Sequence, residues 1–288
     1  MPDNNTSQLV GSLISDRYEV HKEIGRGIFG AVYAGFHRQL EKPIAIKVLF
    51  QQVEPDDTGF KRFHREAQAA SVLSHANIVK IYDFGLSENG RPFIIMDKVD
   101  GENLKDILLR EGRMEVPRAL PIFLQVCDAL SHLHENGFLH RDIKPDNIIL
   151  HDTAFQKDYA TLVDFGIAKK INEPKNRKLT MEGTVVGTPA YMSPEQVMGK
   201  KLDNRSDIYA FGVLMYVVLT SKLPISGGDA IETMTKQVTD QHIDISRACP
   251  GLKITKALEM IVNKSLNKLP SERQKSMKEL HQQLTACL

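Results

Sequence analysis

The segment that decides the fold lies near the middle of the chain and reads His140-Arg141-Asp142-Ile143-Lys144-Pro145-Asp146-Asn147. Carboxylates, cations and an amide are concentrated in this short loop, and packing alone does not explain their density. Asp142 can accept a hydroxyl proton, Asn147 can offer an amide oxygen to a hard cation, and Lys144 can neutralise charge on a phosphoryl group in transfer. A solvated turn can also be charged, but it would not need the residues in this order.

A further carboxylate follows downstream in Asp164-Phe165-Gly166, directly after the apolar pair Leu162-Val163. An aspartate at the end of a strand can bind Mg²⁺ where the ion bridges nucleotide phosphates. So short a motif occurs often by chance, and its meaning depends on its place after the segment 140–147.

A glycine-rich turn lies upstream between two strand patterns and reads Gly25-Arg26-Gly27-Ile28-Phe29-Gly30. Glycines lack a Cβ, so backbone N–H groups can close over phosphates. The alternatives are a dinucleotide-binding turn and a purely structural hairpin. A dinucleotide site requires a helix at this point, whereas Ala31-Val32-Tyr33-Ala34 has the pattern of a second strand. The structural hairpin stays open on this motif alone.

Lys47 and Glu66 are charged residues on faces that are otherwise apolar. Strand alternation puts Lys47 on the same face as Ala45 and Leu49. Glu66 lies on the apolar face of a predicted helix over residues 59–74. Because an unpaired buried charge is costly, we expect the two to pair and to direct the ammonium at an anion beneath the glycine turn. The alternative is that Lys47 reaches solvent at a sheet edge and Glu66 is a solvated helix residue.

The pattern of the chain changes near Val99-Asp100-Gly101. Short strand patterns dominate residues 17–99, interrupted by the one helix, and helical patterns dominate residues 100–285. Residues 1–16 are polar and lack the basic and apolar regions of a signal peptide, so we expect a flexible leader there.

The overall composition is that of an ordinary globular chain, with 288 residues, of which 42% are hydrophobic. The net charge of +1 gives no general attraction to nucleic acid. The three cysteines are widely spaced and fit neither a disulfide framework nor a zinc site. The most apolar run, Ala210–Leu219, is about half the length that spans a bilayer. We therefore expect a cytoplasmic protein with no nucleic-acid partner and no membrane span.

The chain resembles the protein kinase family in the order of its motifs, which are the glycine turn, Lys47, Glu66, the segment 140–147, Asp164-Phe165-Gly166 and Ser193-Pro194-Glu195. The resemblance covers roughly residues 17–285. It implies an α+β bilobal fold forming a single catalytic domain. The N-lobe, residues 17–99, would be small and mostly antiparallel β with one key helix. The C-lobe, residues 100–285, would be larger and mostly α-helical.

The same resemblance implies that ATP is the phosphoryl donor and that Mg²⁺ is the metal, with Mn²⁺ as an alternative. Asp142 would orient and deprotonate the acceptor hydroxyl, and Glu66 would place Lys47 at the α and β phosphates. Asn147 and Asp164 would bind the metal. The remaining ATP contacts would come from the glycine turn, the adenine pocket, the gatekeeper Met96 and the hinge, namely Ile24, Gly25, Gly27, Gly30, Val32, Ala45, Met96, Asp97, Val99 and Ile149.

Two features imply Ser or Thr as the acceptor in protein substrates. Lys144 lies two residues after Asp142, as in Ser/Thr kinases, and Thr188 resembles the substrate-platform residue that bridges such an aspartate and lysine. Each is a common loop residue when taken alone.

Arg141, directly before Asp142, indicates control by phosphorylation, since a loop phosphate can pair with its guanidinium. We expect Thr180 and Thr184 to be the phosphorylated residues. A plain solvated basic loop is the alternative. Autophosphorylation in trans would use a homodimer.

The sequence departs from the family pattern at three places, one of which is the segment 151–159, longer than the usual turn there. Ser193 replaces the usual alanine before Pro194-Glu195, and Tyr209 stands where many members carry Trp. Glu195 is still expected to pair with Arg273, and the variants resemble the bacterial branch of the family. A pseudokinase scaffold is one alternative function, but it would typically lack a catalytic residue. A small-molecule phosphotransferase is the other, but it would lack the substrate platform.

Overall fold

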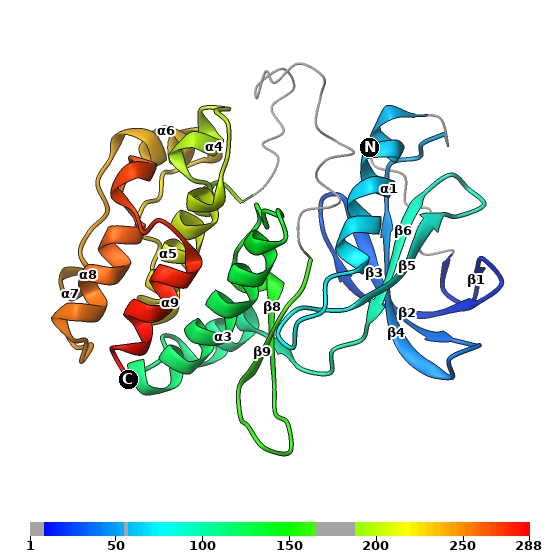
Figure 1. Ribbon diagram of the computed structural model, residues 1–288, viewed down its shortest axis with the longest axis horizontal. Helices are drawn as coiled ribbons and strands as arrows, with labels where there is room; N and C mark the ends of the chain where they lie inside the picture. The colour runs from blue at the N-terminus through cyan, green and yellow to red at the C-terminus, as the bar shows by residue number, and fades with distance from the viewer. Residues whose placement is uncertain (1–8, 55–56, 165–187) are drawn as a thin grey trace. The chain divides into compact units, whose positions relative to one another are not determined.

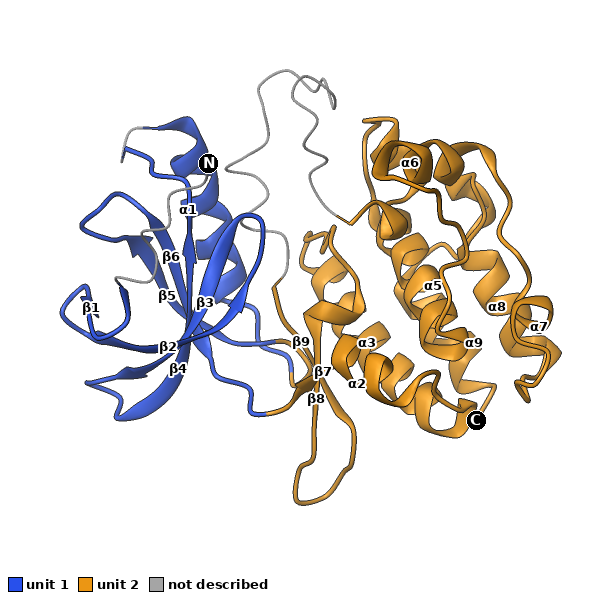
Figure 2. Ribbon diagram, turned by 180° about the vertical axis from the view of Figure 1, so that it is seen from behind, with its two compact units in different colours: residues 1–75, 79–100, 166–174 blue, residues 76–78, 101–165, 175–288 orange. Residues whose placement is uncertain are grey.

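The computed structural model describes residues 9–54, 57–164 and 188–288, which fall into two compact units (Figures 1 and 2). The described part of unit 1 is residues 9–54, 57–75 and 79–100, and that of unit 2 is residues 76–78, 101–164 and 188–288. Within residues 57–164 the chain crosses between the units after residues 75, 78 and 100. The domain bounds 17–99 and 100–285 stay a prediction.

The described part of unit 1 consists of an antiparallel sheet and helix α1 (Figure 1). The strand order is β1-β2-β3-β4-β6-β5. The strands are β1 (Leu13–Ile14), β2 (Tyr18–Arg26), β3 (Gly30–His37), β4 (Lys42–Leu49), β5 (Ile81–Leu86) and β6 (Pro92–Asp97). Helix α1, Thr58–Ser71, begins after Asp57, whose carboxylate accepts a hydrogen bond from the Gly59 backbone at 2.5 Å.

Apolar side chains on one face of these strands form the core of unit 1. The cluster includes Tyr18, Val20, Tyr33, Ile44, Ile46, Val48, Phe93 and Ile95. Alternation along a strand places every second residue on this face. Helix α1 buries Phe63, Ala67 and Ala70, spaced by four and three residues, which is one helical face. The sequence pattern for α1 is therefore confirmed.

Strands β1 and β5 were not predicted. Leu13 and Ile14 pair with Glu19 and Tyr18, and Ile14 is buried in the core. The flexible leader expected over residues 1–16 is therefore wrong at residues 13–14, because an apolar side chain and a strand ladder fix that segment. Strand β5 escaped detection because it is only half-buried and lacks regular alternation.

Unit 2 is mostly helical, with one small antiparallel sheet. Its strands are β7 (Glu102–Asn103), β8 (Ile148–His151) and β9 (Tyr159–Leu162), paired in that order. Its helices are α2 (Leu104–Glu111), α3 (Val116–Glu135), α4 (Pro194–Val197), α5 (Asn204–Thr220), α6 (Ala230–Thr239), α7 (Ile245–Ala248), α8 (Lys256–Ser265) and α9 (Met277–Thr285). Short 3₁₀ turns span Pro145–Asn147, Pro189–Tyr191 and Pro270–Glu272. The antiparallel β unit with a helix and the helical unit confirm the α+β fold.

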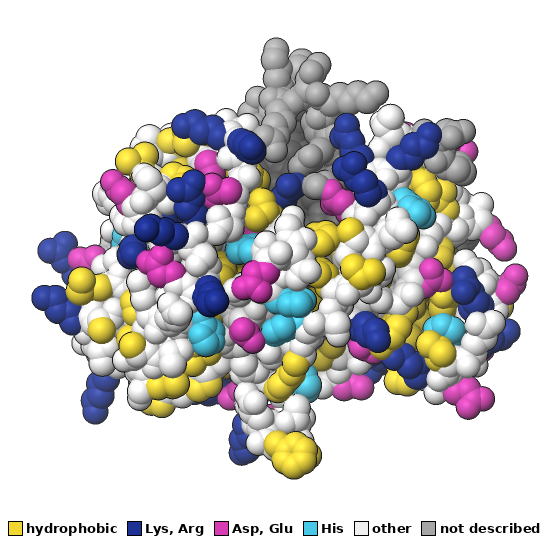
Figure 3. Space-filling model, viewed as in Figure 1, with side chains coloured by type: hydrophobic (Ala, Val, Ile, Leu, Met, Phe, Trp, Pro, Cys, Tyr) yellow, Lys and Arg dark blue, Asp and Glu magenta, His cyan; other side chains and the backbone are white. Residues whose placement is uncertain are grey.

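Helix α5 forms the centre of unit 2, where it packs against α3 and α8. It is apolar around nearly its whole circumference, which is the pattern of a helix buried on all sides. None of the helices in the described residues combines the length and apolarity needed to cross a membrane. On the face that Figure 3 shows, acidic and basic side chains are interspersed, in keeping with the net charge of +1.

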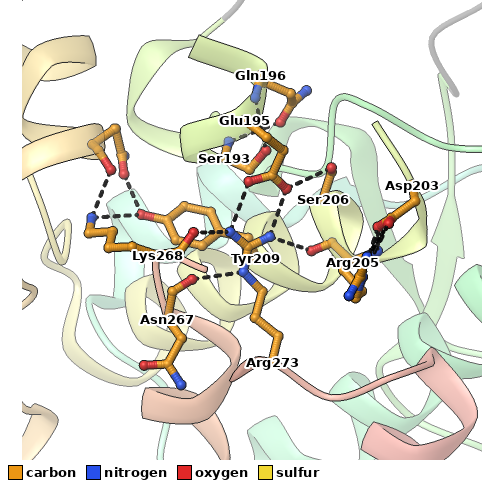
Figure 4. A network of polar contacts seen from close by, with 11 residues as sticks. Ser193, Glu195, Gln196, Asp203, Arg205, Ser206, Tyr209, Asn267, Lys268 and Arg273 are labelled. Carbon is orange, nitrogen blue, oxygen red and sulfur yellow. Dashed lines mark hydrogen bonds and ion pairs between the residues drawn. The ribbon is translucent and has the colours of Figure 1, made fainter. Parts of the chain in front are cut away.

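A buried ion pair joins α4 to the segment that precedes α9 (Figure 4). The Arg273 guanidinium donates to both carboxylate oxygens of Glu195, at 2.7 and 2.9 Å. Ser206 donates a third hydrogen bond to this carboxylate at 2.7 Å. Arg273 also donates to backbone carbonyls, including that of Arg205 at 2.8 Å. The expected pairing of Glu195 with Arg273 is confirmed, and every charged group in it has hydrogen-bond partners.

Ser193, the departure from the family's alanine, has a visible role in this region. Its side chain accepts a hydrogen bond from the Gln196 backbone at 3.3 Å, and the Gln196 side chain accepts one from the Ser193 backbone at 2.9 Å. This reciprocal capping box satisfies backbone donors at the start of α4. An alanine could not supply the hydroxyl.

Replacing Arg273 by methionine should lower the free energy of unfolding by about 3–5 kcal/mol, because it leaves the Glu195 carboxylate buried without its cation. Urea denaturation measures the change. The double variant Glu195→Gln/Arg273→Met should recover part of the loss. Lys236→Met, which removes an exposed pair with Glu232, is the matched control and should leave stability nearly unchanged. A loss below about 1 kcal/mol for Arg273→Met would contradict the assignment.

The Glu195–Arg273 pair also makes the stability of the protein depend on pH in acid. Burial raises the pKa of Glu195, but the hydrogen bond and charge of Arg273 outweigh it, so the pKa lies below its ordinary value of 4.5. The stabilisation is therefore present above that value and is lost as the pH falls through the lower folded-state pKa. Urea denaturation from neutral pH downward should show wild type and Glu195→Gln converging in stability below pH 4.5. A constant difference across that range would contradict this.

Candidate active site

A carboxylate within α5 fixes the backbone of the segment 140–147. Asp207 accepts hydrogen bonds from the backbone N–H groups of His140 and Arg141, at 2.8 and 2.9 Å. The imidazole Nε2 of His134, on α3, lies 2.8 Å from the same carboxylate. Burial raises the pKa of Asp207, but the His134 contact, the nearby histidines and the Arg141 N–H outweigh it, and the net shift is downward. The carboxylate is thus stabilised in its charged form.

The loop that Asp207 binds has an unusual backbone. Arg141 has φ of 62°, a left-handed conformation that costs a non-glycine residue about 1–2 kcal/mol. Asp164, the first residue of the second motif, has φ of 61°. Strained residues persist where surrounding contacts over-determine them, and they cluster at functional sites. Here one of them directly precedes Asp142 and the other is Asp164 itself, and these are the two aspartates for which the sequence predicted chemical roles.

The three predicted catalytic residues of this loop lie together. The Lys144 ammonium lies 3.3 Å from the Asp142 carboxylate. The Asn147 amide nitrogen donates to the Asp142 backbone carbonyl at 2.7 Å and to its carboxylate at 3.1 Å. Both bonds use the amide nitrogen, so neither of them occupies the Asn147 amide oxygen. Ile143, fully buried, fixes the loop between Asp142 and Lys144.

Asn147 and Asp164, the predicted metal ligands, are attached to neighbouring strand ends. Asn147 directly precedes β8, and Asp164 lies two residues after the end of β9. The Val163 N–H donates to the Asn147 carbonyl at 2.9 Å, and Ile148 pairs with Leu162. An amide oxygen and a carboxylate are the hard oxygen donors that Mg²⁺ takes, so the residue types fit the metal. Ile149, half-buried, faces away from Ile148 along the same strand.

In unit 1, several predicted ATP contacts share one face of the sheet. Gly25 pairs with Val32, Val32 with Lys47, and Ala45 with Met96. Cross-strand partners lie on the same face, and so do residues two apart in one strand. The sheet register therefore collects Val32, Ala45, Lys47 and Met96 on a single face.

Lys47 is 8% exposed, as its apolar neighbours predicted. Glu66 is half-buried on α1, beside the buried Ala67. The pairing of Lys47 with Glu66 stays a prediction.

The glycine turn is a hairpin between β2 and β3, with no helix following it. This excludes the dinucleotide-binding alternative. A Cβ on Gly30 would lie 2.4 Å from the Val48 carbonyl oxygen, so packing requires a glycine there. A Cβ on Gly25 or Gly27 would meet nothing closer than 3.9 Å. Steric packing does not explain these two glycines, which favours close approach of a ligand. Ile24, directly before the turn, is 46% exposed.

The predicted hinge begins at a residue whose carboxylate is fixed by two other strands. The Tyr82 hydroxyl on β5 donates to the Asp97 carboxylate, and the Lys42 ammonium on β4 lies 3.1 Å from it. Lys42 also lies 3.8 Å from the centre of the Tyr82 ring. The Asp97 N–H donates to the Lys80 carbonyl at 3.0 Å. These contacts set the backbone direction in which the chain continues to Val99.

The other predicted residues are Thr188, Thr180 and Thr184. Thr188 directly precedes the turn Pro189–Tyr191, and the Tyr191 N–H donates to its carbonyl at 3.0 Å. Its bridge to Asp142 and Lys144 stays a prediction. Thr180 and Thr184 lie outside the described residues.

Three residues around the loop were missed from the sequence, namely His134, Gln196 and Asp207. Asp207 could have been found from the sequence, because it is a carboxylate within the apolar helix pattern of 207–220. A charged residue in an apolar pattern is also what singled out Lys47. Gln196 donates to the Arg141 carbonyl at 3.4 Å and so links α4 to the loop. No local pattern marks Gln196 or His134, since their partners are distant in sequence.

Comparison with known proteins agrees with this arrangement. A family model described as the protein kinase domain matches residues 18–285. The chain is 38% identical to the serine/threonine-protein kinase pkn3 of Myxococcus xanthus, over 98% of this chain and 52% of that protein. It is 37% identical to the serine/threonine-protein kinase PknB of Mycobacterium tuberculosis, over 95% of this chain and 43% of that protein. The chain thus spans about half or less of the length of these curated relatives.

Among solved structures, the PknI kinase domain of Mycobacterium tuberculosis superposes with a TM-score of 0.74 at 26% identity. The match covers 96% of this chain and 97% of that one. The family model spans nearly the whole chain, and the curated relatives above are bacterial. The chain therefore belongs to the protein kinase domain family and resembles its bacterial serine/threonine members.

Proposed function

We propose that the chain is a serine/threonine protein kinase that transfers the γ-phosphoryl group of ATP to Ser or Thr hydroxyls of protein substrates. The observation that carries the proposal is the contact of Asp142 with Lys144 and Asn147 in a loop fixed by Asp207. Family membership implies the use of ATP and a divalent metal in general terms. The assignment of individual roles rests on the residues themselves.

In this mechanism Asp142 orients the acceptor hydroxyl and accepts its proton, and Lys144 stabilises charge on the transferring group. Asn147 and Asp164 would hold Mg²⁺, or Mn²⁺ in its place, which when bound would neutralise the phosphate charge. Lys47, positioned by Glu66, and the glycine turn would bind the phosphates. Catalysis would then consist mainly of positioning and charge stabilisation.

The adenine ring would be bound by Ile24, Val32, Ala45 and Ile149. The common sheet face of Val32, Ala45 and Met96 supports this assignment in unit 1. The backbone of Asp97–Val99 would read the adenine edge, and Met96 would be the gatekeeper.

A pseudokinase scaffold fits less well, because Lys47, Asp142 and Asp164 are all in the sequence. A small-molecule phosphotransferase fits less well because the chain builds Ser193, Glu195 and Arg273 into a buried support beside the expected protein-substrate platform. The proposal also includes a cytoplasmic location, in keeping with three free cysteines.

Incubation with ATP and Mg²⁺ should increase the intact mass of wild type in steps of one phosphoryl group. Asp142→Asn should slow that gain by about 10²-fold or more, because the general base is lost. Asp146→Asn is the matched control, since Asp146 lies in the same loop but is exposed and pairs with Lys105 at 2.9 Å. Equal gains in wild type and Asp142→Asn, or no gain in wild type and no transfer to added protein, would refute the mechanism.

The proposal includes autophosphorylation between two copies of the chain at Thr180 and Thr184. Peptide mapping of wild type after incubation with ATP should find phosphate on at least one of these residues. The double variant Thr180→Ala/Thr184→Ala should lose it, and Asp142→Asn should lack it unless wild type is added in trans. Phosphate found only at other residues would show that this choice of sites is wrong.

A further inference from the structure

A glutamine on α6 is buried with both ends of its amide engaged. The Gln237 side chain, fully buried, donates to the Ala190 carbonyl at 2.6 Å. Its amide oxygen accepts a hydrogen bond from the Tyr209 hydroxyl of α5 at 2.5 Å. If the amide were flipped, its oxygen would face the Ala190 carbonyl oxygen, and two acceptors would oppose each other. The orientation of the side chain is therefore fixed by its partners.

The carbonyl that Gln237 binds belongs to the turn Pro189–Tyr191. This turn is joined back to Thr188 through the hydrogen bond from the Tyr191 N–H to the Thr188 carbonyl, 3.0 Å long. The Met192 N–H closes the turn on the Pro189 carbonyl at 3.1 Å. Gln237 thus fixes, through Ala190, the segment that begins at the expected substrate platform.

Further contacts stiffen this link from the other side. The Lys268 ammonium donates to the Gln237 backbone carbonyl at 2.8 Å, near the end of α6 where helix carbonyls lack intrahelical partners. It also lies 3.4 Å from the Tyr209 hydroxyl oxygen. Figure 4 shows Tyr209 and Lys268 beside the guanidinium of Arg273, which lies 4.8 Å from the centre of the Tyr209 ring. The turn is therefore connected to the buried Glu195–Arg273 pair.

Stability alone does not account for this arrangement. An apolar side chain of similar volume at position 237 would avoid burying an amide, and a polar group in a core is advantageous only when all its bonds are made. What the amide adds is a directional bond to one carbonyl of one turn. Tyr209 completes it, since a Trp in its place could donate a hydrogen bond but could not accept one from Lys268.

We infer that Tyr209 and Gln237 are positioning residues that set the place of the turn Pro189–Tyr191, and thereby the affinity of the enzyme for its protein substrate. The inference rests on the proposed function. It assigns these two residues a role in binding the protein substrate that is separate from binding ATP.

The test compares Gln237→Glu and Tyr209→Phe with wild type in the full chain. The first is nearly isosteric and still accepts from Tyr209, but once ionised its carboxylate cannot donate to Ala190, so KM is measured at a pH high enough to ionise a buried carboxyl group. The substrate is the peptide that wild type phosphorylates fastest in a degenerate Ser/Thr peptide library. We expect KM for the peptide to rise about tenfold in Gln237→Glu, with KM for ATP unchanged. Tyr209→Phe should also raise KM for the peptide. The double variant should raise it by less than the two single effects combined.

Gln274→Glu is the matched control for a loss of stability. Gln274 is also fully buried, accepts from the Ser265 hydroxyl at 3.1 Å and donates to the Ile261 carbonyl at 3.2 Å. It does not contact the turn. It should lower stability in urea to a similar extent while leaving KM for the peptide at the wild-type value.

The possible outcomes separate the positioning role of Gln237 and Tyr209 from the proposed kinase function. An active wild type whose peptide KM is unchanged by Gln237→Glu, or is raised equally by Gln274→Glu, refutes the positioning role and leaves the proposed function intact. A rise in KM for ATP as large as that for the peptide also refutes it. A wild type that phosphorylates no peptide in the library refutes the proposed function, and the positioning role with it.

Discussion

The charge of Asp207, buried within α5, is the interaction on which the arrangement of the loop depends. A carboxylate in a core is costly unless hydrogen bonds and opposite charge compensate its lost hydration. Here the compensating groups are the backbone N–H groups of His140 and Arg141 and the imidazole of His134. Because the N–H groups must converge on one carboxylate, Arg141 adopts a left-handed backbone. That backbone in turn sets where Asp142 begins and where its side chain meets Lys144 and Asn147.

Similar reasoning applies to the other polar contacts inside unit 2. Two contacts join segments that apolar packing alone would not hold in one position. They are the ion pair of Glu195 with Arg273 and the hydrogen bond of Tyr209 with Gln237. In a low-dielectric interior a hydrogen bond is stronger, and an unmade one is more costly, so such contacts select one arrangement among several of similar packing. The desolvation of Lys268, which lowers its pKa to about 8, belongs to the same region. Unit 2 therefore combines an apolar scaffold with a small set of directional bonds.

The sequence predicted the elements and residues whose signals are local. The periodicity of α1, α3 and α5 is visible in a short window, and Lys47 stood out because its strand neighbours are apolar. Strand β5 was missed because it is half-buried, and β1 because it has only two residues. Asp207, Gln196 and Gln237 were not assigned, because each acts on backbone groups 47 to 67 residues away. Periodicity contains no information on such partners. The order of the motifs identified the family without revealing how the loop is supported.

The support of the loop by α5 also has a consequence for biosynthesis. A ribosome completes residues 140–147 before it makes Asn204–Thr220, and Arg273 comes later still. The carboxylate of Asp207, which accepts from the Arg141 N–H in the left-handed part of the loop, is therefore added to the chain after the loop itself. The hydrogen bonds from the loop to Asp207 can therefore form only after α5 has been translated. A nascent chain would thus carry every residue of the segment 140–147 before it contains the carboxylate that two of their backbone N–H groups bind.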